Sequence, residues 1–290
     1  MFIAMFNGWY FFWLLLSAGA VVALYYLLRN RTVRTQKLVL FGFLAVGLLL
    51  HFLKVYIPPY SVDTARMLRD SWFVNICGAN IALFPIFFWS KNDRVKDYMF
   101  YIGMLSGLIA LFYPQEPMAK VDQLAEQLDI LRFYYHHWMV MAIPLLMVVL
   151  GHHKLSYKRL ISAPTGLLLL MLFIMLNQIF QSELGFIPLR DRGNFFGIDY
   201  KNTSYIWGPG ANDAIGDFLA LFTPDFFKTV PVGEFAGQVK YWPWFWLIVP
   251  VYLLVTPLSL LLALPFDYKS VKADVKALQK KKKHPTPHHP

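Results

Sequence analysis

Residues 9–28 read WYFFWLLLSAGAVVALYYLL, an unbroken run of apolar and small residues that contains no charged side chain. An α-helix needs about 20 mostly apolar residues to cross the hydrocarbon core of a membrane. The run therefore predicts a transmembrane helix. If similar runs follow along the chain, the fold is that of an integral membrane protein.

The remainder of the chain repeats this pattern. Of its 290 residues, 57% are hydrophobic and only 15% are charged, and the mean hydropathy is +0.46. Soluble domains are about 25% charged, so the composition excludes an ordinary soluble enzyme, a disordered chain and a nucleic-acid-binding protein, despite a formal net charge of +10. The sequence predicts an all-α polytopic membrane protein with seven transmembrane helices, at about residues 9–28, 38–57, 72–90, 97–113, 132–151, 162–183 and 242–264.

The basic residues give an orientation to these helices. Seventeen of the 27 Lys and Arg residues fall in loops on one side and in the tail, and nine fall on the other side. Under the positive-inside rule, the N-terminus faces outward and the C-terminus faces the cytoplasm. We expect residues 1–268 to form the membrane domain and residues 269–290, with Lys280 to Lys283, to form a basic disordered cytoplasmic tail.

Two outer segments are more than simple connections. Residues 184–241 separate the last two predicted helices, and aromatic residues such as Phe195, Tyr200 and Trp207 favour a packed cap. Residues 114–131 alternate apolar and acidic residues at helical spacing. That pattern predicts an amphipathic helix lying on the outer membrane surface.

Polar residues inside the predicted helices indicate a site, because such groups are costly in a membrane. Four of them, each on a different predicted helix, lie about five or six residues from the outer boundary: His51, Cys77, His137 and Asn177. At 1.5 Å per residue this is about 8 Å deep. The shared depth predicts a polar cavity open to the outer leaflet, lined further by Asn80, His136 and Gln178.

The chemistry available in this layer is nucleophilic. A thiol beside an imidazole can attack a carbonyl, and an amide such as that of Asn80 or Asn177 can stabilise the oxyanion. Neighbouring helical residues point about 100° apart, so only one of His136 and His137 faces the cavity well. Structural roles stay open: Cys77 as a packing residue, a hydrogen-bonded histidine, and amides that join helices.

Other chemistries find no support. The motifs GxSxG, GxxxxGK[ST] and HExxH are absent, and a single cysteine excludes an intrachain disulfide and a CxxC site. A catalytic metal site needs three ligands, whereas His51 and one of His136 and His137 supply two. We therefore expect neither a metal ion nor another cofactor.

Four segments carry a resemblance to a known family. They are Asn75-Ile-Cys77-Gly-Ala-Asn80 with Phe84-Pro85, Tyr134-Tyr135-His136-His137-Trp138, Asn202-Thr-Ser-Tyr205-Ile-Trp-Gly-Pro209, and Tyr241-Trp-Pro243-Trp-Phe-Trp with Leu264-Pro265-Phe266. In this order they resemble the YwaF-like family of bacterial seven-span membrane proteins. That family is related to the animal transmembrane acyltransferase known as transmembrane protein one-six-four. The resemblance covers about residues 38–268.

The resemblance implies that Cys77 is an acyl-accepting nucleophile, that His137 is its base, and that Asn202 and Tyr205 contribute to substrate binding. In this family the residue after the cysteine is often acidic, whereas here it is Gly78. The implied function is a lipid acyltransferase or acyl hydrolase of a bacterial cytoplasmic membrane, acting on membrane lipids. The alternatives are a non-catalytic binder or transporter of a lipid or small molecule, and a structural partner in an envelope complex.

Overall fold

The computed structural model describes residues 2–58, 60–64, 67–68, 72–118, 127–185, 204–210, 214–229, 233 and 236–283. Within these residues the chain forms helices and turns, and strand-like pairing is confined to an isolated bridge between Thr229 and Val239. The predicted all-α class is confirmed.

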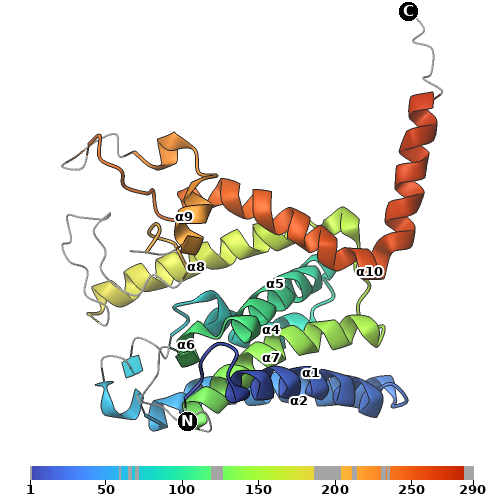
Figure 1. Ribbon diagram of the computed structural model, residues 1–290, viewed down its shortest axis with the longest axis horizontal. Helices are drawn as coiled ribbons and strands as arrows, with labels where there is room; N and C mark the ends of the chain where they lie inside the picture. Colours follow the sequence, from blue (N-terminus) through green and yellow to red (C-terminus); the bar gives the residue numbers. More distant parts are fainter. Residues whose placement is uncertain are drawn as a thin grey trace, which may run out of the picture.

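The long helices run mainly along the horizontal direction of Figure 1, except for the last part of α10, which turns upright. They are α1 (Gly8–Leu28), α2 (Val33–Leu53), α4 (Ile76–Trp89), α5 (Asp93–Phe112), α7 (Leu128–Val149), α8 (Ser162–Glu183) and α10 (Ile248–Lys283). Shorter elements are α6 (Gln115–Met118), α9 (Ala214–Ala220) and single turns at Lys54–Tyr56, Tyr60–Val62, Tyr157–Arg159, Asp225–Phe227 and Phe245–Leu247.

Side-chain caps explain where several helices begin. The side-chain oxygen of Asn7 accepts a hydrogen bond from the backbone N–H of Tyr10, and that of Asn75 accepts one from Gly78. Thr32 and Asn92 cap α2 and α5 in the same way. These bonds satisfy N–H groups that have no partner in the first turn of a helix.

Five of the described helical segments are long and apolar enough to cross a membrane: Gly8–Leu28, Val33–Val62, Asp93–Met118, Tyr157–Glu183 and Phe245–Ala277. Two predicted spans are not among them. The third begins at Ile76 instead of residue 72, so α4 has only 14 residues. The fifth begins at Leu128 instead of residue 132 and includes Asp129 and Arg132. Seven spans and their orientation stay predictions.

Helix α7 occupies the core of the bundle. Most of its residues are buried, and it contacts α1, α2, α4 and α5. Glycines permit the closest approach: a Cβ atom at Gly103 would lie 2.3 Å from the carbonyl oxygen of Val140, and one at Gly107 would lie 2.7 Å from that of His137. Because such contacts are too short for a side chain, these glycines fix the position of α7 against α5.

The basic loops meet at one end of the bundle, which we call the basic end. There the fully buried carboxylate of Asp97 on α5 accepts a hydrogen bond from His153 at 2.8 Å and another from Arg159 at 2.5 Å. A buried carboxylate is costly unless it is paired and hydrogen-bonded. This cluster ties the α7–α8 connection to α5.

The described part of the 184–241 segment packs on the bundle at the opposite end. Ile206 is buried, and its carbonyl oxygen accepts the backbone N–H of Trp244 at 2.8 Å. The indole N–H of Trp246 binds the carbonyl oxygen of Tyr205 at 2.8 Å. These bonds hold residues 205–206 against the start of α10.

Two expectations for irregular or surface segments differ from the structure. The predicted amphipathic helix at 114–131 is divided: residues 115–118 form α6, residues 119–126 lie outside the described residues, and residues 128–131 open α7. The tail expected to be disordered from residue 269 is helical through Lys283, because α10 continues past a bend at Asp267.

Candidate functional site

Cys77 lies in the first turn of α4. It is the second residue of the helix, and its side chain is partly accessible. The Asn75 side chain caps the same turn by accepting the N–H of Gly78 at 2.7 Å. The local sequence therefore fixes the backbone around the thiol, which stands at the positive end of the helix dipole.

His51 and Asn177 come close to this turn. A Cβ atom at Gly78 would lie 3.6 Å from Cε1 of His51. The His51 ring stacks on Phe73, with ring centroids 5.3 Å apart, and the Phe73 carbonyl oxygen accepts a hydrogen bond from Nδ2 of Asn177 at 3.3 Å. Residues from α2 and α8 thus surround the segment that leads into Cys77.

The two neighbouring histidines of α7 have different surroundings. Nε2 of His136 lies 3.0 Å from the carbonyl oxygen of Gly47, and its Nδ1 lies 3.5 Å from the guanidinium of Arg132. A carbonyl oxygen only accepts, so the proton of His136 resides on Nε2. Both nitrogens of His136 are therefore engaged: Nε2 joins α7 to α2, and Nδ1 contacts Arg132 within α7.

His137 uses its other nitrogen. Its Nδ1 lies 2.8 Å from the carbonyl oxygen of Phe133, one turn earlier, and donates to it. In a neutral imidazole this leaves Nε2 with a lone pair, and among the described residues no hydrogen bond occupies it. Glu116 on α6 lies within electrostatic reach of both His137 and Cys77. The described residues contain no hydrogen bond between Cys77 and either His51 or His137.

Asn80 lies one turn beyond Cys77 and is fully buried. Its Oδ1 accepts the hydroxyl proton of Tyr98 at 2.8 Å, whereas its Nδ2 has no partner among the described residues. Tyr98 is also within electrostatic reach of Cys77. The site therefore contains an oriented amide with an unused donor beside the thiol.

Gln178 and Tyr205 lie where α8 meets the cap. Oε1 of Gln178 accepts the indole N–H of Trp207 at 3.1 Å, and Tyr205 has a positive φ of 57° at the start of the described cap residues. These contacts join α8 to the cap. Asn202 lies outside the described residues.

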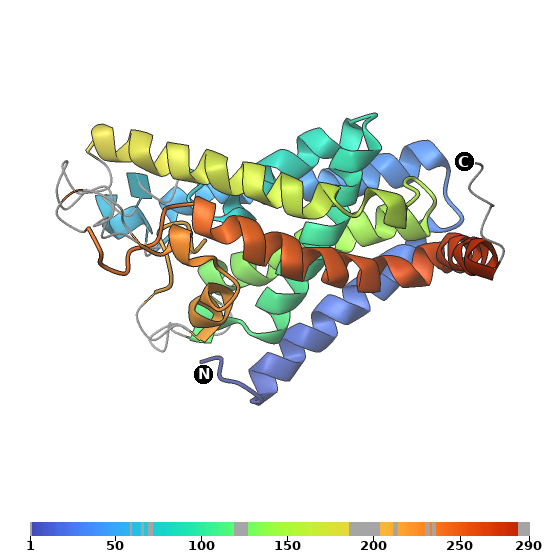
Figure 2. The same cartoon turned by 90° about the horizontal axis from the view of Figure 1, so that it is seen from above.

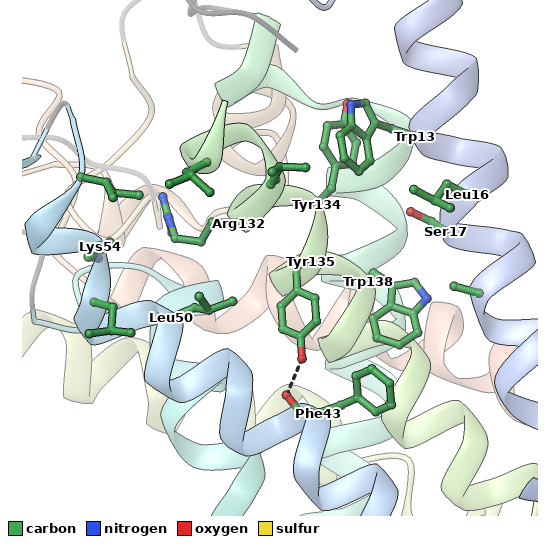
Figure 3. A pocket seen from close by; sticks show the side chains of 15 residues that line it. Trp13, Leu16, Ser17, Phe43, Leu50, Lys54, Arg132, Tyr134, Tyr135 and Trp138 are labelled. Carbon is green, nitrogen blue, oxygen red and sulfur yellow. Dashed lines mark hydrogen bonds between the residues drawn. The ribbon is translucent and has the colours of Figure 1, made fainter. Parts of the chain in front are cut away.

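A cavity of about 630 Å³ lies between α1, α2 and α7 (Figure 3). Its walls are almost entirely apolar and aromatic, in contrast to the polar cavity predicted at this depth. The side chains of Lys54 and Arg132 lie on one side of it in Figure 3, and the two cationic groups lie 5.3 and 5.6 Å from the centre of the Tyr60 ring. The lining residues are Trp13, Leu16, Ser17, Ala20, Phe43, Leu50, Leu53, Lys54, Ile57, Leu128, Leu131, Arg132, Tyr134, Tyr135 and Trp138.

Neither Cys77 nor His137 lines this cavity. Residues Leu131, Tyr134, Tyr135 and Trp138 form one side of α7, and His137 lies on another, where its backbone faces α5. Arg132 lies between the cavity and the histidines of α7. It lines the cavity, pairs with Asp129 at 2.6 Å, and lies 3.5 Å from Nδ1 of His136.

Four polar residues near these features are absent from the predicted site. Arg132 and Lys54 appear in the sequence as boundary cations, yet Lys54 is buried and lies 5.3 Å from the centre of the Tyr60 ring. Glu116 appears as part of a surface helix. Tyr98 has no sequence signal, because its role depends on α5 meeting α4.

A metal centre finds no ligand set in the described part of the chain, where no group of three or more His, Cys, Asp and Glu side chains converges.

Comparison with known proteins identifies a family. The family model described as the TMEM164 family matches residues 4–262, nearly the whole bundle. No curated protein and no solved structure gives a significant match. The match includes the segments around Cys77 and His137 and confirms the resemblance to transmembrane protein one-six-four. The chain belongs to the TMEM164 family.

Proposed function

We propose that the protein is a membrane lipid acyltransferase or acyl hydrolase, with Cys77 as nucleophile and His137 as general base. The observation that carries this proposal is the hydrogen bond from Nδ1 of His137 to the carbonyl oxygen of Phe133. It fixes the tautomer in which Nε2 accepts a proton, as a general base must. His136, with both nitrogens engaged, is a positioning residue.

The reaction divides into two steps. Nε2 of His137 takes the thiol proton of Cys77 while sulfur attacks the ester carbonyl of a lipid; the C–S bond forms, the C–O bond breaks, and the imidazolium returns the proton to the departing alcohol. A lipid hydroxyl or water then attacks the thioester carbonyl; the new C–O bond forms, the C–S bond breaks, and His137 takes the proton of the attacking hydroxyl and returns it to the Cys77 sulfur.

Asn80 is the proposed oxyanion donor. Its Oδ1 accepts the hydroxyl proton of Tyr98, which orients the amide. Its buried Nδ2 donates no hydrogen bond among the described residues. A preoriented donor of this kind stabilises the charge that develops on the carbonyl oxygen.

The cavity supports a lipid as the substrate. Its 630 Å³ lies within the range of about 300–1,000 Å³ that is usual for ligand sites. Its apolar walls suit an acyl chain.

A second candidate is a non-catalytic lipid binder or transporter. It is favoured by the separation of the cavity from Cys77 and His137. In this case a lipid would occupy the cavity and raise the thermal stability of the protein, with no lipid consumed.

Turnover by the purified protein separates the two candidates. The wild type, Cys77→Ala and Cys77→Ser are incubated in detergent with a bacterial phospholipid extract, and the lipids are followed by mass spectrometry. We expect the wild type to produce lysolipid together with free or transferred acyl chains and the variants to produce none. Unchanged lipids with the wild type, together with lipid-dependent thermal stabilisation, would favour the binder.

A further inference from the structure

Residues 268–283, which we call the tail helix, run across the bundle axis instead of along it. Figure 1 shows them leaving the basic end, and Figure 2 shows them end-on beside the bundle. The change of direction occurs at Asp267, whose φ of −128° and ψ of 21° depart from helical values. The tail helix therefore lies parallel to the plane of a membrane that the bundle crosses.

Two aspartates hold the tail helix in this direction. Asp267 accepts the backbone N–H of Tyr157 at 2.9 Å. Seven residues further on, Asp274 accepts the hydroxyl proton of Tyr157 and pairs with Lys158 at 2.7 Å. Contacts at the bend and beyond it, both to the turn that contains Tyr157 and Lys158, fix the direction of the helix.

The tail helix has an apolar face that the bundle leaves uncovered. Tyr268, Val271 and Val275 follow one another at helical spacing, and Tyr268 and Val275 are 56% and 47% exposed. The lysines Lys269, Lys272 and Lys276 are exposed on the adjoining face. Apolar residues on one face and lysines on the next are the pattern of a helix at a membrane surface.

The length of the last membrane-spanning segment also indicates that the tail helix meets a membrane surface. The helical segment Phe245–Ala277 comprises 33 residues and contains an 18-residue window apolar enough for a span, whereas about 20 residues cross a bilayer. The segment continues through the bend and into the tail helix. Its final residues therefore emerge at the headgroup level, where the available apolar phase is lipid.

We propose that the tail helix lies in the lipid–water interface at the basic end, with Tyr268, Val271 and Val275 immersed and Lys269, Lys272 and Lys276 bound to anionic phospholipid headgroups. Lysines near a membrane surface are attracted by anionic lipid, and their long stems let the charge reach the headgroups from the side of the helix. This proposal does not depend on the catalytic one.

Spin labels in the full-length protein test the immersion. In a Cys77→Ala background, Val275→Cys and its control Ala277→Cys, on the opposite side of the helix, are labelled and reconstituted into nanodiscs of phosphatidylcholine with one third phosphatidylglycerol. We expect the label at 275 to collide with oxygen and to be shielded from an aqueous nickel chelate, and the label at 277 to show the reverse. Equal exposure of both labels to nickel would overturn the proposal.

Lipid charge tests the headgroup contacts. Immersion at position 275 is expected to decrease in nanodiscs of phosphatidylcholine alone, and to decrease equally when Lys269, Lys272 and Lys276 are all replaced by Gln in anionic nanodiscs. Immersion that is the same in both lipids and in the triple variant would overturn the assignment of the lysines to anionic lipid.

Discussion

Nδ1 of His137 donates a hydrogen bond to the carbonyl oxygen of Phe133, 2.8 Å away and one turn earlier in the same helix. This bond fixes the tautomer of a buried histidine and leaves Nε2 with a lone pair. The neighbouring His136 instead bonds to Gly47, on another helix. Two adjacent residues of the same type therefore have separable roles.

Replacement of the two histidines tests this separation. His137→Gln is expected to reduce kcat/KM for lipid turnover by about 10²–10⁴-fold, the usual contribution of a general base, with little change in Tm. His136→Gln is expected to lower Tm, because it loses its bonds to Gly47 and Arg132. Kinetics and thermal unfolding of both variants provide the comparison. Equal losses of turnover with unchanged Tm would contradict it.

Asn80 and Tyr98 test the oxyanion donor. Asn80→Ala is expected to reduce kcat by about 10²–10³-fold, as for other oxyanion donors. Tyr98→Phe removes only the hydroxyl that orients the amide, so a smaller loss of kcat is expected with KM unchanged. If Asn80→Ala keeps full kcat, the amide is a structural link and not a donor.

Gly107 tests the packing that positions His137. A Cβ atom there would lie 2.6 Å from Cβ of Met141 and 2.7 Å from the carbonyl oxygen of His137. Gly107→Ala should therefore destabilise the protein by about 1–3 kcal/mol through overpacking and lower turnover. The control is Gly42→Ala, whose Cβ would meet nothing within 4 Å; it should be neutral or stabilising by up to about 1 kcal/mol.

The buried cluster at the basic end is expected to dominate local stability. Asp97→Ala leaves His153 and Arg159 without their carboxylate and should cost about 3–5 kcal/mol. Asp93, which is 61% exposed and 3.7 Å from both partners, is the control, and Asp93→Ala should cost less than about 1 kcal/mol. Denaturant titration in detergent measures both. Similar costs would show that burial of Asp97 is not the cause.

The titration of His152 is expected to make the stability of the protein depend on pH. Burial, with Lys37 and Lys96 nearby, lowers the pKa of His152 below its ordinary value of 6.5. As pH falls below 6.5, His152 binds a proton in the unfolded chain but not in the folded protein. The contribution of His152 to the free energy of unfolding is therefore complete above this pH and is lost below it. The decrease in Tm between pH 7.5 and 5.5 should be smaller for His152→Gln than for the wild type. An identical decrease would contradict this assignment.

The helical class follows from the sequence because runs such as residues 9–28 have no stable alternative to a buried or membrane helix. The lengths of individual helices do not follow. Helix α4 is short because the Asn75 cap starts it after residues 72–74. Helix α7 begins before the predicted residue 132 because Asp129 and Arg132 pair with each other inside the helix. Both effects depend on local hydrogen bonds that hydropathy does not register.

The candidate site was only partly predictable. Depth along the helices selects Cys77, His51, His137 and Asn177, because residue number measures depth in a straight helix. The distinction between His136 and His137 depends on the carbonyl groups that each meets, and the pairing of Tyr98 with Asn80 depends on how α5 meets α4. The cavity lies against α1, which contributes no polar residue to the predicted layer.

The most direct test of the central claim is intact mass spectrometry of the purified protein after brief incubation with phospholipid. The account predicts that the wild type gains the mass of one fatty acyl chain, removable by neutral hydroxylamine, that Cys77→Ala gains none, and that His137→Gln gains it much more slowly. An acyl adduct of equal amount on Cys77→Ala, or lipid turnover by that variant at the wild-type rate, would contradict the assignment of Cys77 as the nucleophile.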